Sequence, residues 1–305
     1  MRQYKNKLSD FKQWNEKPHA KEWLIFPKNI SPYLSLDEVA LTNGELYTVL
    51  TSKKAKGKKG SIVALIAGTK AETVIEHIRR IDEKLRRTVT EITLDMANSM
   101  KLIAKKCFTN ATQVIDRFHV QKLALEALQE LRISHRWIEM DNETIQLKKA
   151  KENQIKFIPD TLSNGDTKKQ LLARSRYLLY KCKSKWTRSQ QERATLLFEL
   201  YPDIKKAYSL NQQLRSIYNN NNDKNIAMTK LAHWYDQVEK SGFKSFNIVV
   251  NTIMINYRGI LNYFDKRSTN ASAESFNAKI KNFRNHFRGV RNTEFFLYRL
   301  TRLFA

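Results

Sequence analysis

Three acidic residues of this chain lie at positions where a carboxylate could bind a metal ion: Asp37, Asp95 and Glu274. Asp37 falls within the strand-like run LSLDEVAL, where a charge is costly unless it is paired or binds a cation. Asp95 ends the run VTEITLD just before helical sequence, at the edge of a sheet where ligands of open α/β sheets gather. Two such aspartates on neighbouring strands suit a hard cation such as Mg²⁺, which takes oxygen ligands.

Glu274 begins the last helix expected from the sequence, which runs from Ser272 to a stop at Gly289. It lies about 200° around that helix from Phe276, on the polar side. The apolar stripe is Phe276, Ile280, Phe283 and Phe287, and the polar side also holds Asn277, Lys281, Arg284 and Arg288. A carboxylate beside these basic residues would place a metal ligand next to a surface that can bind a chain of phosphate groups. The ordinary alternative is a first-turn Glu favoured by the helix dipole.

Asp116 competes for the second acidic position because it also ends a predicted strand, TQVID, and is followed by His119. Each aspartate taken alone could equally be a strand-end or capping residue. No Ser-His-Asp arrangement, Gly-rich phosphate loop or HExxH motif occurs, which removes support for nucleophilic hydrolases, P-loop enzymes and zinc proteases. The chemistry that remains is that of carboxylates and metal ions.

The elements that would position these side chains follow the order βββαβαβ, with a long helical block and a last helix after them. Two apolar runs joined by Asn43-Gly44 predict a hairpin, and the short apolar run 61–68 predicts a third strand. Helical spacing over 71–87 and 97–107 alternates with strands over 89–95 and 112–116, which implies parallel pairing. The predicted division is an N-terminal arm (1–33), a first core segment (34–120), a helical insertion (121–262) and a C-terminal segment (263–305).

The charge balance of the whole chain indicates a polyanionic partner. Its 305 residues include 55 Lys plus Arg against 30 Asp plus Glu, a formal net charge of +25. Such an excess is typical of binding to phosphate backbones, from which Lys and Arg release condensed counterions. Two cysteines without a CxxC motif indicate neither a zinc site nor a disulfide framework. We expect a cytoplasmic, nucleoid-associated protein, because no apolar stretch is long enough for a membrane helix or a signal peptide.

Four stretches together resemble the catalytic core of bacterial insertion-sequence transposases of the ISL-type DDE family. They are LSLDEVALTNGELYTVL (34–50), EITLDMANSM (91–100), VIDRFHVQKLALEAL (114–128) and STNASAESFNAKIKNFR (268–284). They occur in the family's order and with its kind of spacing, and Asp-Arg-Phe-His-Val is the most distinctive. Longer members of the family also carry a zinc ribbon and a helix-turn-helix upstream, which residues 1–33 could not hold. A separate small polypeptide for recognition of the element ends is therefore a hypothesis.

The resemblance implies an α/β fold with an RNase H-like mixed sheet, interrupted by a large all-α insertion. It implies a transposase that cuts DNA at element ends and joins them to target DNA, with two Mg²⁺ ions, replaceable by Mn²⁺, on Asp37, Asp95 and Glu274. Double-stranded DNA and a homodimer or larger assembly are the expected partners, without a membrane. Two alternatives stay open, a non-catalytic domesticated relic and an RNase H-like structure-selective nuclease. Near-site support is expected from Asp116, His119, Asn270 and Asn277.

Two basic groups are predicted to line the DNA. One is the lysine loop after the hairpin, and the other surrounds the last helix. Their members are Lys53, Lys54, Lys56, Lys58, Lys59, Lys279, Lys281, Arg284, Arg288 and Arg291. Contact with about six phosphates predicts a log–log salt slope of about −5, from ~0.9 per phosphate. The alternative for each group is a solvated charge run.

Overall fold

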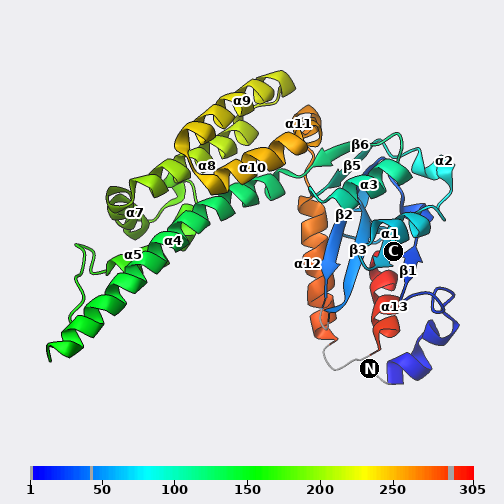
Figure 1. The fold of residues 1–305 in the computed structure, drawn as a ribbon. Helices are drawn as coiled ribbons and strands as arrows, with labels where there is room; N and C mark the ends of the chain where they lie inside the picture. Colours follow the sequence, from blue (N-terminus) through cyan, green and yellow to red (C-terminus); the bar gives the residue numbers. More distant parts are fainter. Residues whose placement is uncertain (1–2, 42–43, 288–291) are drawn as a thin grey trace. The chain divides into compact units, whose positions relative to one another are not determined.

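The structure, a computed structural model, describes residues 3–41, 44–287 and 292–305 (Figure 1). The chain forms two compact units, one of residues 1–117 with 258–305 and the other of residues 118–257. The first unit contains a mixed α/β fold, and the described regular elements of the second are all helices. Within the described part of the chain, no helix is long and apolar enough to cross a membrane.

A six-stranded mixed sheet forms the centre of the first unit, with strand order β1-β4-β3-β2-β5-β6. The strands β1 to β4 pair antiparallel, whereas β2 pairs parallel with β5 and β5 parallel with β6. Their bounds are β1 Trp23–Ile25, β2 Tyr33–Ala40, β3 Leu46–Ser52, β4 Ile62–Ala67, β5 Glu91–Leu94 and β6 Thr112–Ile115. The predicted hairpin and the strand–helix alternation after it are therefore present, although Asn43 of the hairpin turn lies outside the described residues.

β1 is a strand that the sequence did not predict, because residues 1–33 were interpreted as a docking arm. Its three residues extend the sheet by pairing antiparallel with β4, and Leu24 is fully buried. The arm before it forms two short turns, η1 (Tyr4–Leu8) and η2 (Asp10–Gln13). A further turn, η3 (Pro27–Asn29), leads into β2, and η5 (Lys53–Ala55) follows β3. A three-residue edge strand is too short to leave a periodic signal.

The helices of the first unit are α1 (Ala71–Ile78), α2 (Glu83–Arg86), α3 (Asn98–Cys107), α11 (Tyr257–Lys266), α12 (Ala271–His286) and α13 (Thr293–Phe304). The single helix predicted over 71–87 is wrong, because the chain breaks after α1 and restarts at α2. Asp82 causes the restart, since its carboxylate accepts a hydrogen bond from the Lys84 N–H as an N-cap. The last predicted helix is α12, and its predicted stop, Gly289, lies outside the described residues.

α12 runs alongside β2 (Figure 1) and is held there by an aromatic core. Phe276 and Ile280 of α12 pack with Val39 and Val49 of the sheet and with the phenylalanines of α13. The stripe predicted for this helix thus faces the core, as helical periodicity requires. Since the stripe and β2 belong to one hydrophobic cluster, the rotation of α12 about its axis is set, and with it the direction of its polar side chains.

The second unit begins with the long helix α4 (Arg117–Glu152), which continues directly from β6. Six helices and a short turn, η6 (Lys183–Lys185), follow it. The helices are α5 (Lys168–Arg174), α6 (Arg176–Leu179), α7 (Arg188–Leu200), α8 (Pro202–Asn220), α9 (Lys224–Ser241) and α10 (Lys244–Ile255). Its core is built from buried side chains including Leu128, Leu171, Leu197, Leu214 and Trp234.

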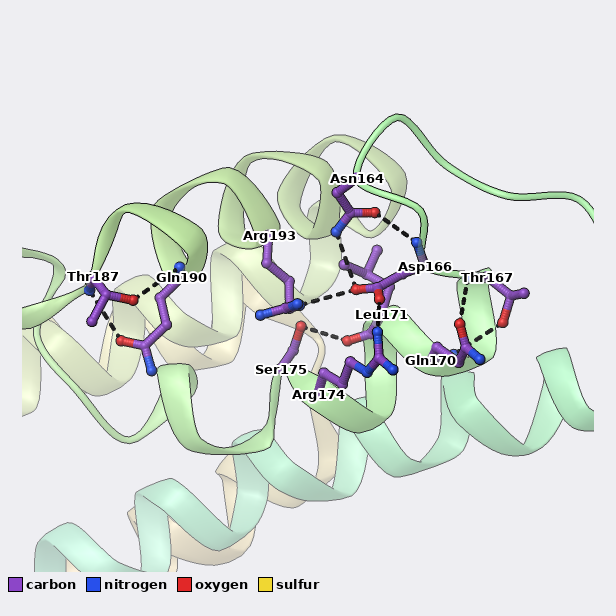
Figure 2. A network of polar contacts seen from close by, with 10 residues as sticks. All are labelled: Asn164, Asp166, Thr167, Gln170, Leu171, Arg174, Ser175, Thr187, Gln190 and Arg193. Atoms are coloured by element: carbon purple, nitrogen blue, oxygen red, sulfur yellow. Dashed lines mark hydrogen bonds and ion pairs between the residues drawn. The ribbon is translucent and has the colours of Figure 1, made fainter.

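A buried carboxylate joins two of these helices (Figure 2). Asp166, 1% exposed, lies just before α5 and forms ion pairs with Arg174 of α5 and Arg193 of α7. Thr167 and Thr187 begin α5 and α7 with matching capping boxes, in which a glutamine three residues later bonds back to the cap. The two helix starts and the ion pairs therefore define the local packing of α5 against α7.

Candidate active site

The register of the parallel strands brings three aspartates level with one another, Asp37 within β2 and Asp95 and Asp116 directly after β5 and β6. Ser35 of β2 lies beside Thr93 of β5, and continuing that register by two residues puts Asp37 level with Asp95. Leu94 lies beside Ile115 of β6, so Asp116 is level with Asp95 on the other side. The Asp116 N–H donates to the Leu94 carbonyl at 3.1 Å, which continues the pairing past the strand ends. Adjacent strands are about 4.8 Å apart, so the row Asp37, Asp95, Asp116 is close together.

α12 adds two side chains to this row from one face. Glu274 and Asn277 are three residues apart and therefore neighbours on a helix surface. The Asn277 Nδ2 donates to Asp37 Oδ2 at 2.6 Å, while the backbone N–H of Glu38 donates to Asp37 Oδ1 at 2.8 Å. Asp37 is thus oriented by two donors, one of which ties it to the helix that carries Glu274.

Asp116 and Glu274 form a tight group of ligand atoms, with one carboxylate oxygen of each within 4.8 Å of the other. Asp116 is 1% exposed, and its Oδ2 accepts a hydrogen bond from the backbone N–H of Asn270, the N-cap of α12, at 3.1 Å. His119 lies in the first turn of α4, which continues directly from Asp116. Asp116 therefore holds the N-terminus of α12 by a hydrogen bond, and α12 carries Glu274.

The donor set fits a hydrated divalent cation. Carboxylate oxygens predominate, as Mg²⁺ prefers. Two amides near them also have buried polar atoms without a hydrogen-bond partner among the described residues: both side-chain polar atoms of Asn270, and the Oδ1 of Asn277. Unsatisfied buried polar atoms are rare in native proteins and call for an ion or water that they can bind. The amides flank Glu274 in sequence, so water around a bound ion would satisfy them.

Glu38, the residue after Asp37, is a further carboxylate near the row. Burial raises the pKa of Glu38, and the negative charges of Asp95 and Asp37 raise it further. Carboxylates influence each other in this way when they are only a few ångströms apart. Sequence reasoning did not single out Glu38, although its position directly after Asp37 in a strand was a visible signal.

The structure thus brings Glu274 close to Asp116, Asn270 to Asp116, and Asn277 to Asp37, while Asp95 lies level with Asp37 and Asp116 by strand register. Asp95 differs from the others in how it is held. Its Oδ1 accepts the backbone N–H of Ala97 at 2.8 Å, at the start of α3, and it is not part of the tight group around Glu274. Asp116, expected only as support, is part of that group.

The predicted DNA-binding residues differ in their exposure to solvent. Lys54, Lys56, Lys58, Lys59, Lys279 and Lys281 are exposed. Lys279 Nζ also donates to the Gly57 carbonyl at 3.1 Å, which joins the lysine loop to α12. Arg288 and Arg291 lie outside the described residues.

Two predicted DNA ligands point into the protein. The Arg284 side chain is 5% exposed and donates two hydrogen bonds to Glu45, at 2.9 and 2.8 Å. Lys53 is ion-paired to the buried Glu91. Neither cation is available to a phosphate in this arrangement. The sequence placed Arg284 on a polar helix side, but that side faces the hairpin, a fact that helical periodicity cannot supply.

Carboxylates on neighbouring strands of a mixed sheet, with a further acid on a covering helix, form a donor set that could hold a divalent cation. Comparison with known proteins gives the family of the chain. The transposase family of the ISL3 DDE type matches residues 34–300, and the chain belongs to this family. It is also 22% identical over 274 residues to the transposase for insertion sequence element IS1001 of Bordetella parapertussis, covering 89% of this chain and 61% of that protein. The chain therefore spans about three fifths of the length of this relative. No solved structure matches the chain significantly.

Proposed function

We propose that this chain is the catalytic part of a DNA transposase that cuts DNA at the ends of its element and joins the freed ends to target DNA. The observation that carries this proposal is the row formed by Asp37 within β2 and by Asp95 and Asp116 directly after β5 and β6, with Glu274 of α12 close to Asp116. The family membership supports the same function, and the IS1001 relative is a transposase by name.

The fold that we propose is RNase H-like. The order β4-β3-β2-β5-β6, with an antiparallel meander followed by two parallel strands, supports it, and β1 is then an addition at the edge. In that arrangement Asp37 lies on the central strand and Asp95 follows the next one. The helical residues 118–257 are an insertion between β6 and the helix that carries Glu274.

Asp37, Asp95 and Glu274 are the proposed ligands of two divalent cations. When bound, such cations activate the attacking oxygen and stabilise the leaving oxygen of a phosphodiester. The protein's own part is to hold the ligands in place. Asn277 orients Asp37 at 2.6 Å, and Asp116 anchors the N-terminus of α12 through the Asn270 N–H at 3.1 Å. His119, in the first turn of α4, is a proposed near-site residue.

The exposed lysines of the loop after β3 and of α12 are the proposed phosphate contacts. The contact between Lys279 and the Gly57 carbonyl joins the loop to the helix, which supports a single basic surface made from both. Phosphate contacts position the DNA without reading its sequence. Binding should therefore weaken steeply with salt, by a log–log slope of about −0.9 for each phosphate contacted.

The test is cleavage and joining in vitro, with Mg²⁺ and DNA that carries the inverted repeats flanking the gene. Asp37→Asn, Asp95→Asn and Glu274→Gln should abolish both reactions while DNA binding persists. Asp236→Asn, an exposed residue of α9, is the matched control and should behave as the wild type. A wild type that binds the ends but never cuts them would support a non-catalytic relic, and cutting without joining would support a nuclease.

Asp116→Asn separates an anchoring role from a ligand role. An asparagine keeps an acceptor oxygen for the Asn270 N–H but loses the negative charge that a cation requires. We expect Asp116→Asn to retain measurable cleavage and Asp116→Ala to lose most of it. If Asp116→Asn is as inactive as Glu274→Gln while Asp95→Asn stays active, the second acidic ligand is Asp116 rather than Asp95.

A further inference from the structure

The C-terminal half of the long helix α4 carries a row of mainly apolar side chains, here called the α4 stripe. Its members are Ile133, Trp137, Met140, Thr144 and Leu147. Trp137 is 60% exposed, Ile133 and Leu147 are also exposed, and Met140 is half-buried. Contiguous exposed apolar side chains on a protein surface mark sites of interaction.

The other side of this half of α4 packs against the helices of its own unit. Figure 1 shows α7, α8 and α9 along one side of α4. His135 is hydrogen-bonded to Asp203 of α8, and Glu139 accepts a hydrogen bond from the hydroxyl of Tyr201, directly before α8. At 100° per residue, His135 lies about 200° around the helix from Trp137. The α4 stripe therefore points away from the helices against which α4 packs.

The spacing of the α4 stripe is that of a coiled coil. Its members follow one another by four, three, four and three residues. This alternation is typical of the a and d positions in the seven-residue repeat abcdefg. Trp137 and Thr144 occupy a positions, and the remaining three members occupy d positions. The partner that this pattern fits is another helix.

The charges of this segment exclude a phosphate backbone as the natural partner of the stripe. Residues 133–151 carry four Lys or Arg and three Asp or Glu side chains, in a chain whose net charge is +25. Binding to a phosphate backbone depends on a basic excess, and this segment is nearly balanced.

The charges beside the stripe favour a second copy of α4 in parallel. In a parallel pair, a g residue of one helix lies near the following e residue of the other, and these charges set the orientation. Here Arg136 would meet the partner's Asp141, and Glu143 would meet the partner's Lys148. Within the described residues, Arg136 and Asp141 are exposed and form no ion pair, whereas Glu143 is paired with Lys169 of α5. The pair of Arg136 with Asp141 therefore carries the argument.

The antiparallel arrangement of the same stripe is disfavoured by repulsion. If two antiparallel copies overlapped over the whole stripe, Asp141 would lie near the partner's Asp141, and Glu143 near the partner's Glu143. Like charges at the e and g positions select against such a pairing.

We propose that the α4 stripe is a self-association surface, through which two copies of this chain pair their α4 helices in parallel. This inference goes beyond the proposed function and does not depend on the acidic residues of the first unit. Two heptads bury little area, so we expect a weak dimer, with a dissociation constant of about 10–50 µM.

Sedimentation velocity of the full chain without DNA measures this association. Trp137→Glu should raise the dissociation constant about 30-fold or more, because loss of a central aromatic anchor costs ~2 kcal/mol. Ile138→Glu is the matched control, since Ile138 is 54% exposed on the same helix but lies outside the a and d positions. It should associate as the wild type does. Both variants should keep the midpoint temperature of thermal unfolding, because both side chains are exposed.

Charge reversal tests the parallel orientation. Arg136→Asp and Asp141→Arg each bring like charges together across the pair and should weaken self-association about fivefold. An equal mixture of the two variants should regain the affinity of the wild type, because each chain then supplies the charge that the other lacks. Absence of this rescue would overturn the parallel pairing.

Two results would overturn the self-association surface itself. One is a wild type that stays monomeric at about 100 µM, well above the expected dissociation constant. The other is a folded Trp137→Glu variant that associates as strongly as the wild type. Neither result bears on the proposed function, which cleavage and joining of DNA decide separately.

Discussion

Replacing Asp166 by asparagine should loosen the packing of α5 against α7. The Asp166 side chain is 1% exposed and is shared by Arg193, 19% exposed, and Arg174, 56% exposed (Figure 2). Asparagine keeps the shape but removes the charge, so the largely buried Arg193 loses its counter-ion. Breaking a buried ion pair costs about 3–5 kcal/mol. We expect about 3 kcal/mol, at the lower end, because Arg174 can reach water.

Hydrogen–deuterium exchange, read by mass spectrometry, can measure this loss within the two helices. A loss of ~3 kcal/mol should speed the exchange of protected amides in α5 and α7 by roughly 100-fold. The matched control is Glu192→Gln on α7, which breaks an ion pair with Arg188 at side-chain exposures of 58% and 94%. Exposed pairs of this kind contribute about 0.3–0.5 kcal/mol. An increase below about fivefold for Asp166→Asn, ~1 kcal/mol, would refute the reasoning.

The pH dependence gives an independent check of the same pair. Burial by itself raises the pKa of Asp166, but hydrogen bonds and charges of Arg193 and Arg174 outweigh it, so the pKa lies below the ordinary 3.8. The stabilisation by Asp166 is therefore complete above pH ~4–5 and is lost as the pH falls through the lower, folded-state pKa. Asp166→Asn should lack this part of the acid-induced loss of protection, and a variant with an unchanged acid profile would contradict the assignment.

Three further predictions concern the first unit. Gly259→Ala should destabilise it by about 1–2 kcal/mol in thermal unfolding, because the added Cβ would lie 2.7 Å from Ile115 Cγ1. Overpacking of this kind costs about 1–3 kcal/mol, which exceeds the gain in helix propensity from alanine. Glu45→Gln should cost about 3 kcal/mol in the same assay, because it leaves Arg284, whose side chain is 5% exposed, without its counter-ion. Cys107 should stay unmodified by iodoacetamide at pH 8 in the folded protein, because burial raises the pKa of its thiol to about 11. Mass spectrometry measures the modification, and rapid labelling of the native protein would contradict this prediction.

Local sequence patterns were sufficient for the elements around the site. The alternation on both sides of Asn43-Gly44 predicted β2 and β3, and the switch between apolar runs and helical spacing predicted β5, α3 and β6. These are properties of a few consecutive residues, since side chains alternate along a strand and repeat every 3.6 residues along a helix. The same patterns showed that Asp37 lies within a strand and Asp95 directly after one. A buried charge at such a position costs free energy unless it is paired or binds a cation.

The sequence could not decide which of the marked residues face one another. Asp116 forms a group with Glu274 because β6 pairs with β5 and because the N-terminus of α12 is hydrogen-bonded to Asp116. Both contacts join residues that are far apart along the chain. Asp95 remains the predicted second acid, and its place in the row follows from strand register.

The sequence gives the net charge of the chain, but it does not show which charged side chains are exposed and which are paired. Composition alone determined that this chain is strongly basic, and it predicted a polyanionic partner. It could not show that Arg284 is paired with Glu45 or that Lys53 is paired with the buried Glu91. A lysine in a polar loop and a buried lysine look alike in a sequence, because the burial of a charge depends on partners that only the folded chain brings together.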